Sequence, residues 1–183
     1  TQKTFGSDES LIISYSVKNS IINANQLVNL RSFRDDLLKI NGVDSVISIL
    51  DVSLFQSPPL SLMELVSDVY TIDNGKADLD LVENEFQTSP LYANNLVSKD
   101  LKTTALLIPL SISEPSAIID DDVLKTLITE IRSTMDGYRN DADLFLGGVP
   151  MIRNDAIAYI KSDLVIFSLA VILVMSIMLA LIF

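Results

Sequence analysis

The stretch LVIFSLAVILVMSIMLALIF, residues 164–183, decides the class of this protein. It contains no charged residue, no Gly and no Pro, and its only hydroxyl side chains are Ser168 and Ser176. A helix of this length spans roughly 30 Å, which matches the hydrocarbon thickness of a bilayer. A helix buried in a soluble protein would carry a polar stripe, and this one has none. The stretch therefore predicts a transmembrane helix over residues 164–183.

The position of this segment excludes a secretory signal peptide, which lies at the N-terminus and has a shorter apolar region. A C-terminal tail anchor or a glycolipid-anchor signal stays open as an alternative. No basic cluster follows the segment before the sequence ends at Phe183. We therefore expect the sequence to be a piece of a longer membrane protein.

The charges of the chain all precede Leu164 and give it a net charge of −11. An acidic domain is poorly suited to nucleic acid, whose phosphates need Lys and Arg, or to an anionic lipid surface. The last charged residues before the segment cancel one another: Arg153, Asp155, Lys161 and Asp163. Cytoplasmic flanks carry an excess of Lys and Arg, so we predict that the domain lies outside the cytoplasm. The chain has no Cys and therefore gives no information on redox compartment.

The soluble part contains a strand–helix–strand pattern twice. The first unit has an alternating strand over residues 11–17, a helix that opens with a capping box of Asn23 and Gln26 and closes at Gly42, and a strand over 43–49. The second unit has a strand over 104–112, a helix that opens at Asp120 and a strand over 142–146. Apolar stripes mark the two helices: Leu27, Leu30, Phe33, Leu37 and Ile40 in the first, and Leu124, Leu127, Ile128, Ile131, Met135 and Tyr138 in the second.

Two such units predict an α+β fold, a ferredoxin-like split βαβ sandwich with two helices on one face of a four-stranded antiparallel sheet. Residues 51–102 belong to neither unit and form a helical insertion, with short helices expected over 62–69 and 79–86 and a hairpin arm at Leu96 and Val97. We therefore divide the chain into an α+β domain, 1–150, and a helix, 151–183, that runs unbroken from Pro150 into the membrane.

Several short motifs resemble the first extracytoplasmic loop of the resistance-nodulation-division (RND) superfamily, in its MMPL-type exporter branch. They are Phe5–Glu9, Ser57–Leu62, Ser89–Tyr92 and, above all, Gly147–Ile152 before the apolar helix. The resemblance covers essentially the whole chain in order. It implies a porter domain that returns to the membrane through the second transmembrane helix.

The resemblance also implies a function, a proton-driven secondary transporter that exports lipids or other hydrophobic compounds. The expected location is the cytoplasmic (inner) membrane, with the domain on the periplasmic side. The implied partners are a membrane lipid or hydrophobic small molecule, the remainder of the transporter chain and a possible homo-oligomer. Proton-relay residues would lie elsewhere, because the apolar segment has no ionisable side chain. The alternative from the residues alone is a membrane-anchored extracytoplasmic sensor or binding domain, and a hydrolase is a third class.

Catalytic and cofactor signals are weak, and we predict neither an enzyme nor a cofactor. The absence of His and Cys excludes a Ser/His/Asp triad, a Cys nucleophile and a typical zinc site. Residues 120–122 are most simply the acidic first turn of a helix, and residues 73–80 lack the spacing of a calcium loop. Gly147, Gly148 and Pro150 predict a tight strand-to-helix turn and not a phosphate site.

An exporter of lipid-like cargo needs apolar surface outside the membrane, and the stripes of the two main helices are used by the sheet. Apolar residues that remain are in the insertion and near the membrane. Of these we predict substrate contacts at Phe55, Leu62, Phe86, Tyr92 and Met151, with Leu54, Leu60, Leu65, Leu91 and Ile152 in the same set. The competing interpretation is that these residues close a small core beneath the insertion.

Overall fold

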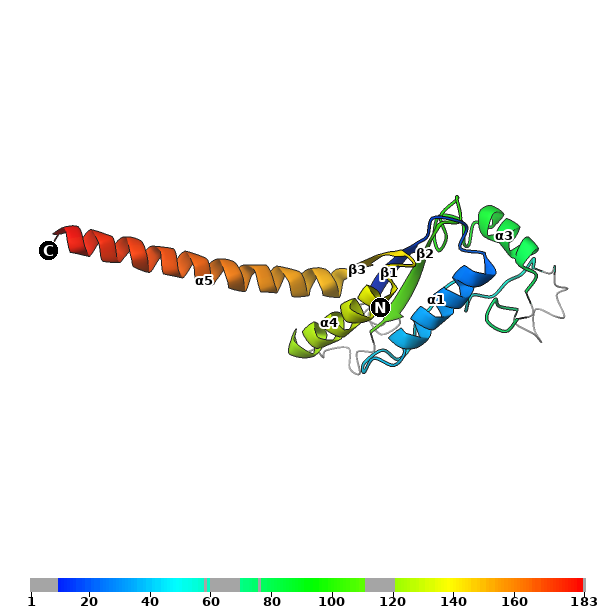
Figure 1. Cartoon of the computed structure of the whole chain (residues 1–183), viewed down its shortest axis with the longest axis horizontal. Coiled ribbons are helices and arrows are strands. Elements are labelled where there is room, and N and C mark those ends of the chain that lie inside the picture. Colours follow the sequence, from blue (N-terminus) through cyan, green and yellow to red (C-terminus); the bar gives the residue numbers. More distant parts are fainter. Residues whose placement is uncertain (1–9, 58, 60–69, 76, 111–120, 183) are drawn as a thin grey trace, which may run out of the picture.

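A computed structural model describes residues 10–57, 59, 70–75, 77–110 and 121–182 (Figure 1). The strands are β1 (Ser10–Ser16), β2 (Thr103–Pro109) and β3 (Asp143–Gly147). The helices are α1 (Ala24–Leu37), α3 (Leu79–Thr88), α4 (Asp121–Tyr138) and α5 (Val149–Ile182). The predicted α+β class is confirmed. The helix expected over 62–69 lies outside the described residues.

The sheet has three antiparallel strands in the order β2-β1-β3. The central strand β1 alternates as its sequence predicts, with Leu11, Ile13 and Tyr15 buried on one face. On the other face Ile12 of β1 and Phe145 of β3 are exposed. The sheet is thus buried on one face and largely open on the other.

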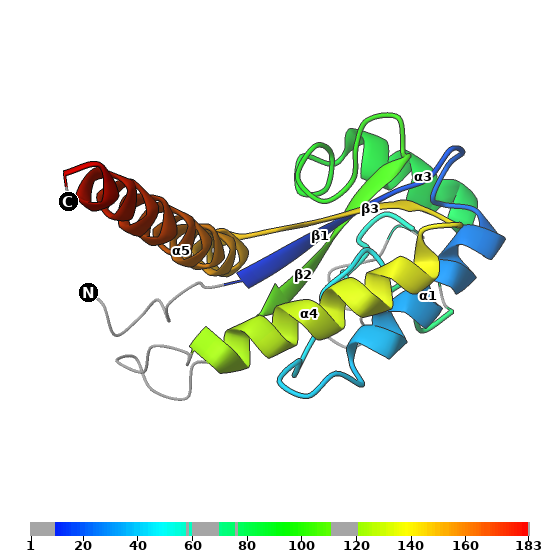
Figure 2. The same ribbon diagram turned by 60° about the vertical axis from the view of Figure 1, so that its left-hand side comes forward.

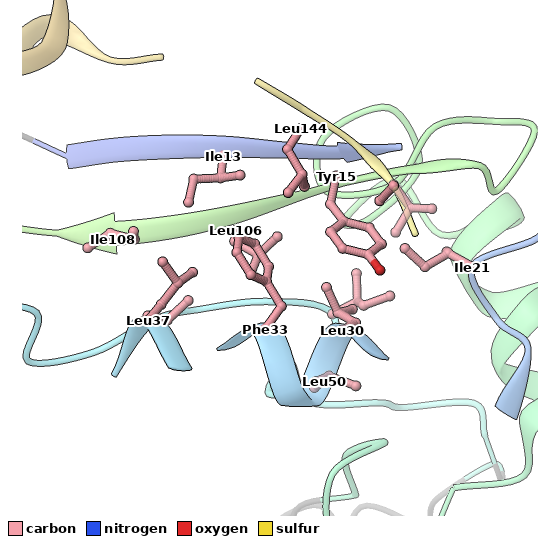
Figure 3. Close-up of a cluster of buried hydrophobic side chains, with 14 of the residues drawn as sticks. Ile13, Tyr15, Ile21, Leu30, Phe33, Leu37, Leu50, Leu106, Ile108 and Leu144 are labelled. Carbon is pink, nitrogen blue, oxygen red and sulfur yellow. The ribbon is translucent and has the colours of Figure 1, made fainter. Parts of the chain in front are cut away.

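Helices α1 and α4 lie side by side on the buried face of the sheet (Figure 2). Figure 3 shows Leu30, Phe33 and Leu37 of α1 pointing toward Ile13 and Leu106 of the sheet. The Phe33 ring lies 5.9 Å from the Tyr15 ring and 5.0 Å from the ring of Tyr138, which ends α4. These aromatic contacts join both helices to the sheet.

The fourth strand predicted over 43–49 is wrong. Ile47 makes one antiparallel pair with Leu107, through two backbone hydrogen bonds of 2.8 Å, and forms no named strand. The Asp51 carboxylate accepts hydrogen bonds from the Ser48 amide and hydroxyl, and the Asp51 amide donates to the Ser48 carbonyl oxygen. This local turn competes with the strand and takes the chain away from β2 after a single pair.

The first helix begins where the sequence predicts and ends earlier. The Asn23 side chain accepts a hydrogen bond from the Asn25 amide, whereas the Gln26 side-chain oxygen has no partner among the described residues. The reciprocal half of a capping box is therefore absent. The helix ends at Leu37, and Gly42 lies beyond it at φ 94°, in a turn closed by Val43.

The predicted hairpin arm precedes β2. Val97 pairs with Thr104, and the Ala105 amide donates to the Leu96 carbonyl oxygen at 3.1 Å. The arm brings the end of the insertion back to the sheet. Helix α3, capped by Asp78, lies at the end of the sheet opposite to α5 (Figures 1 and 2).

Helix α5 has 34 residues and leaves the domain without a break. Its first turns contact α4, β1 and β3, and beyond Tyr159 every described residue is exposed. Among the described residues it is the one helix that is long and apolar enough to cross a membrane. Length and composition thus agree with the predicted membrane span.

Candidate functional site

The predicted substrate contacts do not form one site. Phe86 and Tyr92 are buried, whereas Phe55 is 42% exposed. Met151 is half-buried on α5, at the end of the sheet remote from α3. Leu62 lies outside the described residues.

The Glu85 carboxylate organises the part of the insertion that contains Phe55. Glu85 lies on α3 and is 1% exposed. Its oxygens accept hydrogen bonds from the Phe55 amide at 2.8 Å, the Gln56 amide at 3.0 Å and the Ser57 hydroxyl at 2.8 Å. A buried carboxylate needs such donors to replace its lost hydration. These bonds hold residues 55–57 against α3.

Phe86 and Tyr92 form an edge-to-face aromatic pair behind this loop. Their ring centroids are 5.3 Å apart at an interplanar angle of 87°. The Tyr92 hydroxyl donates to the Ser53 carbonyl oxygen, and burial together with the charge of Glu85 raises the pKa of Tyr92. The structure therefore places both rings in the hydrophobic core of the domain, where they present little surface to a ligand.

Among the described residues of the insertion, Leu91 and Phe55 are the most exposed large apolar side chains, followed by Leu81 and Leu79 of α3. Leu91 is 61% exposed and follows Ser89 and Pro90, while Phe55 follows the buried Leu54. The Leu54 amide donates to the Tyr70 carbonyl oxygen at 2.8 Å, and the Leu54 side chain is buried. Of the predicted contacts in the described part of the insertion, Phe55 and Leu91 stay exposed.

A buried arginine joins the insertion to α1. Arg34 donates to Asp51 at 2.6 Å and to Asp35 at 3.0 Å, and its guanidinium lies 3.4 Å from Asp73. Arg31 also binds Asp73, at 2.7 Å. Partial burial alone would raise the pKa of Asp73, but these two arginines hold it below its ordinary value.

Sequence reasoning missed this network, because the partners are 17 and 39 residues from Arg34. The one local signal was an arginine next to the apolar stripe of α1. The network also explains why residues 73–75 are a poor cation site, since Asp73 already has two cationic partners. Among the described residues, no group of three carboxylates could hold a metal ion.

A cleft of about 570 Å³ lies between α1 and α4. Its lining is mostly polar, and across it the Tyr138 hydroxyl donates to Asp36 at 2.5 Å. Burial and the Asp36 carboxylate raise the pKa of Tyr138 to about 12. Hydrogen bonds from Lys39 and Tyr138 lower the pKa of Asp36. Lys39 and Tyr138 both bind Asp36, and this polar lining offers little to a hydrophobic compound.

The predicted glycine turn joins β3 to α5. Gly147 ends the strand, and Gly148 has φ 122° before α5 begins at Val149, with Pro150 in its first turn. A Cβ on Gly148 would lie 2.5 Å from the Ser10 carbonyl oxygen. The absent side chain thus allows α5 to start against the first residue of β1.

The chain matches no protein-family model, and no curated protein matches it.

Proposed function

We propose that this chain is a porter-like extracytoplasmic domain and transmembrane helix of an RND-type exporter of the MMPL branch. The whole protein would move lipids or other hydrophobic compounds out of the cytoplasmic membrane. One observation carries the proposal, the continuity of α5 from the sheet of the domain into an apolar segment of membrane length. A rigid helix transmits motion between a soluble domain and a membrane domain, which a flexible linker does not.

The order of the strands supports a ferredoxin-like arrangement. The pair between Ile47 and Leu107 lies on the outer edge of β2, because β1 occupies its inner edge. The order along the sheet is therefore residue 47, β2, β1, β3. A split βαβ sandwich has its second strand at this outer position. In this proposal the single pair at Ile47 occupies the position of that strand, although residues 43–49 form no strand of their own.

The exposure of α5 supports the proposed membrane placement. Its apolar residues from Leu164 onward have no partner in the described part of the chain, and a surface of that size is unfavourable in water. A bilayer supplies the missing burial, at roughly 0.3–0.6 kcal/mol for each Leu, Ile, Val or Phe. The balanced charges between Arg153 and Asp163 favour an extracytoplasmic domain.

Cargo contact is proposed at Phe55 and at a second exposed apolar side chain of the insertion, Leu91. The loop of Phe55 is held by Glu85, so the ring is presented at low entropic cost. An aromatic side chain offers a large apolar contact area. Proton coupling would reside in other helices of the protein, because α5 has no ionisable residue from Leu164 to Ile182.

The proposal is tested by export in cells that express the whole protein. Disruption of the gene should stop export of a hydrophobic compound, and a protonophore should do the same in the wild type. Phe55→Asp should reduce export at unchanged protein level and melting temperature, because the ring is exposed. The matched variant Lys99→Asp changes an exposed residue of the insertion that is not apolar and should export normally.

The alternative, a membrane-anchored sensor or binding domain, predicts a different result. Loss of the gene would then change gene expression or enzyme activity in the cell and leave export intact. Topology is tested separately with a reporter that is active only in the cytoplasm. It should be active when fused after α5 and inactive when inserted at Asn74. Activity at Asn74 would overturn the extracytoplasmic placement.

A further inference from the structure

The first turns of α5, between the domain and the membrane span, carry an apolar stripe that nothing in the described structure covers. Ile152 is 64% exposed, Tyr159 72% and Ile160 58%. Val149 and Ala156 complete the stripe. At 3.6 residues per turn these side chains fall within about 100° of one another around the helix axis.

The other side of the same turns is occupied by the domain. Asp155 forms an ion pair of 2.9 Å with Arg132 of α4, and Met151 packs against the core. The stripe therefore faces away from the domain. A helical segment as short as residues 149–160 is only marginally stable in water on its own. An exposed apolar face on such a segment indicates a surface that binds a partner.

Lipid does not reach most of the stripe. Ala156 precedes Leu164 by eight residues and Ile152 by twelve, so they lie roughly 12 and 18 Å along the helix from the hydrocarbon boundary. The headgroup zone on each side is only about 5–8 Å thick. A tilt of about 20° changes these heights little. A protein surface is thus the occupant that fits the upper stripe.

The charge of Asp163 indicates which kind of protein surface would bind the stripe. It is the last charged residue before the span, lies in the middle of the same stripe and is exposed. Within the described ranges no cationic side chain forms an ion pair with it. In a parallel dimer of two copies, Asp163 would face Asp163, and like charges across a helical seam are destabilising. A partner with a basic side chain at this level is complementary.

We infer that the stripe from Val149 to Ile160 docks a second helix that leaves the same membrane, apolar on the facing side and bearing Lys or Arg opposite Asp163. The inference rests on the membrane insertion of α5 in the proposed function and does not depend on export. The interface between this stripe and the second helix would extend the apolar contact surface of the membrane span above the membrane. It would thereby fix the orientation of α5, and with it the position of the domain above the membrane.

Cysteine labelling of the whole protein in its native membrane tests whether the stripe is covered. The described chain has no Cys, and any elsewhere would be replaced by Ser. Ile152→Cys, Ala156→Cys and Ile160→Cys should react with a membrane-impermeant maleimide several-fold more slowly than the matched control Lys161→Cys. Lys161 has nearly the same depth as Ile160 and lies outside the stripe. Equal labelling of Ile160→Cys and Lys161→Cys overturns the inference.

A further variant distinguishes failure of the docking inference from failure of the proposed membrane placement. Leu173→Cys lies in the middle of the span and should resist the impermeant reagent. Rapid labelling at Leu173→Cys would show that α5 does not span the membrane, which overturns both proposals. If Leu173→Cys resists the reagent while the stripe variants are labelled as fast as Lys161→Cys, the docking of a second helix is overturned and the membrane placement is not.

Photocrosslinking identifies the occupant. A benzophenone side chain at position 160 should crosslink to another membrane-spanning helix that carries Lys or Arg near the contact. Asp163→Lys should reduce that crosslink, and exchange of the partner's basic residue for Asp should restore it. A crosslink to position 160 of a second copy, or a lipid adduct alone, would overturn the assigned partner.

Discussion

Replacement of Glu85 by Gln removes the charge of the carboxylate that holds residues 55–57. In the wild type its two oxygens accept from two backbone amides and from the hydroxyl of Ser57, which is fully buried. The amide of Gln offers one acceptor oxygen and turns an NH₂ group toward the remaining donors. The Ser57 hydroxyl can rotate to accept from that group, but one backbone amide loses its acceptor.

The expected loss can be estimated from these contacts. A hydrogen bond to a charged acceptor contributes about 1.5–3 kcal/mol, and an unsatisfied buried donor costs about 1–3 kcal/mol. Glu85→Gln should therefore destabilise the domain by about 1–3 kcal/mol. Glu85→Ala, which removes both oxygens and leaves a cavity beside Phe86, should cost about 3–5 kcal/mol. Glu83 is exposed on the same helix, so Glu83→Gln should stay within about 0.5 kcal/mol of the wild type.

Urea unfolding in detergent micelles measures these differences, followed by tyrosine fluorescence because the chain has no Trp. Hydrogen exchange adds a local measurement, since the amides of Phe55 and Gln56 should lose protection in both Glu85 variants. If Glu85→Gln and Glu83→Gln unfolded at the same urea concentration with equal protection of these amides, the role assigned to Glu85 would be refuted.

Three further predictions concern other parts of the chain. The arginines around Asp73 lower its pKa below the ordinary value of 3.8. The ionised carboxylate therefore stabilises the domain above pH 3.8, and this stabilisation is lost as the pH falls through the folded pKa. Asp73→Asn should destabilise the domain at pH 7, and its difference from the wild type in urea unfolding should shrink below pH 3.8. Gly148→Ala places a Cβ 2.5 Å from a backbone oxygen at φ 122° and should lower the stability of the domain by about 2–5 kcal/mol. Gly137 of α4 has open space around an added Cβ, so the control variant Gly137→Ala should raise the stability by up to about 1 kcal/mol. Ala156→Pro should kink α5 at a cost of about 3 kcal/mol or more and reduce export by the whole protein without loss of membrane insertion; normal export would show that a straight α5 is unnecessary.

Local sequence patterns were sufficient for the elements with strong periodicity. The alternation of Leu11, Ile13 and Tyr15 identifies β1, and the stripe from Leu27 to Leu37 identifies the buried face of α1. In both cases the apolar spacing repeats several times within one element, so a single exception does not obscure the period. The insertion is harder because its apolar residues occur singly or in pairs.

The missed fourth strand illustrates a competition that periodicity does not reveal. The spacing of Val43, Ile47 and Ile49 predicts a strand, but the Ser48–Asp51 turn and the ion pair of Asp51 with Arg34 hold the chain in another path. Both interactions stabilise a specific backbone route, and the second involves a residue from a different element. Long-range ion pairs of this kind are absent from any local window of sequence.

The sequence by itself determined the candidate membrane-spanning segment, because insertion depends on the summed transfer free energy of consecutive side chains and not on their tertiary partners. It also determined the antiparallel α+β organisation through the periodicity of its strands and helices. Tertiary structure alone decided which apolar residues of the insertion face solvent. Phe55 and Phe86 are both aromatic residues of the insertion, Phe55 in a loop and Phe86 in α3. The Tyr92 ring packs against Phe86, which is buried, whereas Phe55, whose amide binds Glu85, stays 42% exposed. Burial is set by the neighbours that the fold brings together, and those neighbours lie far apart in the chain.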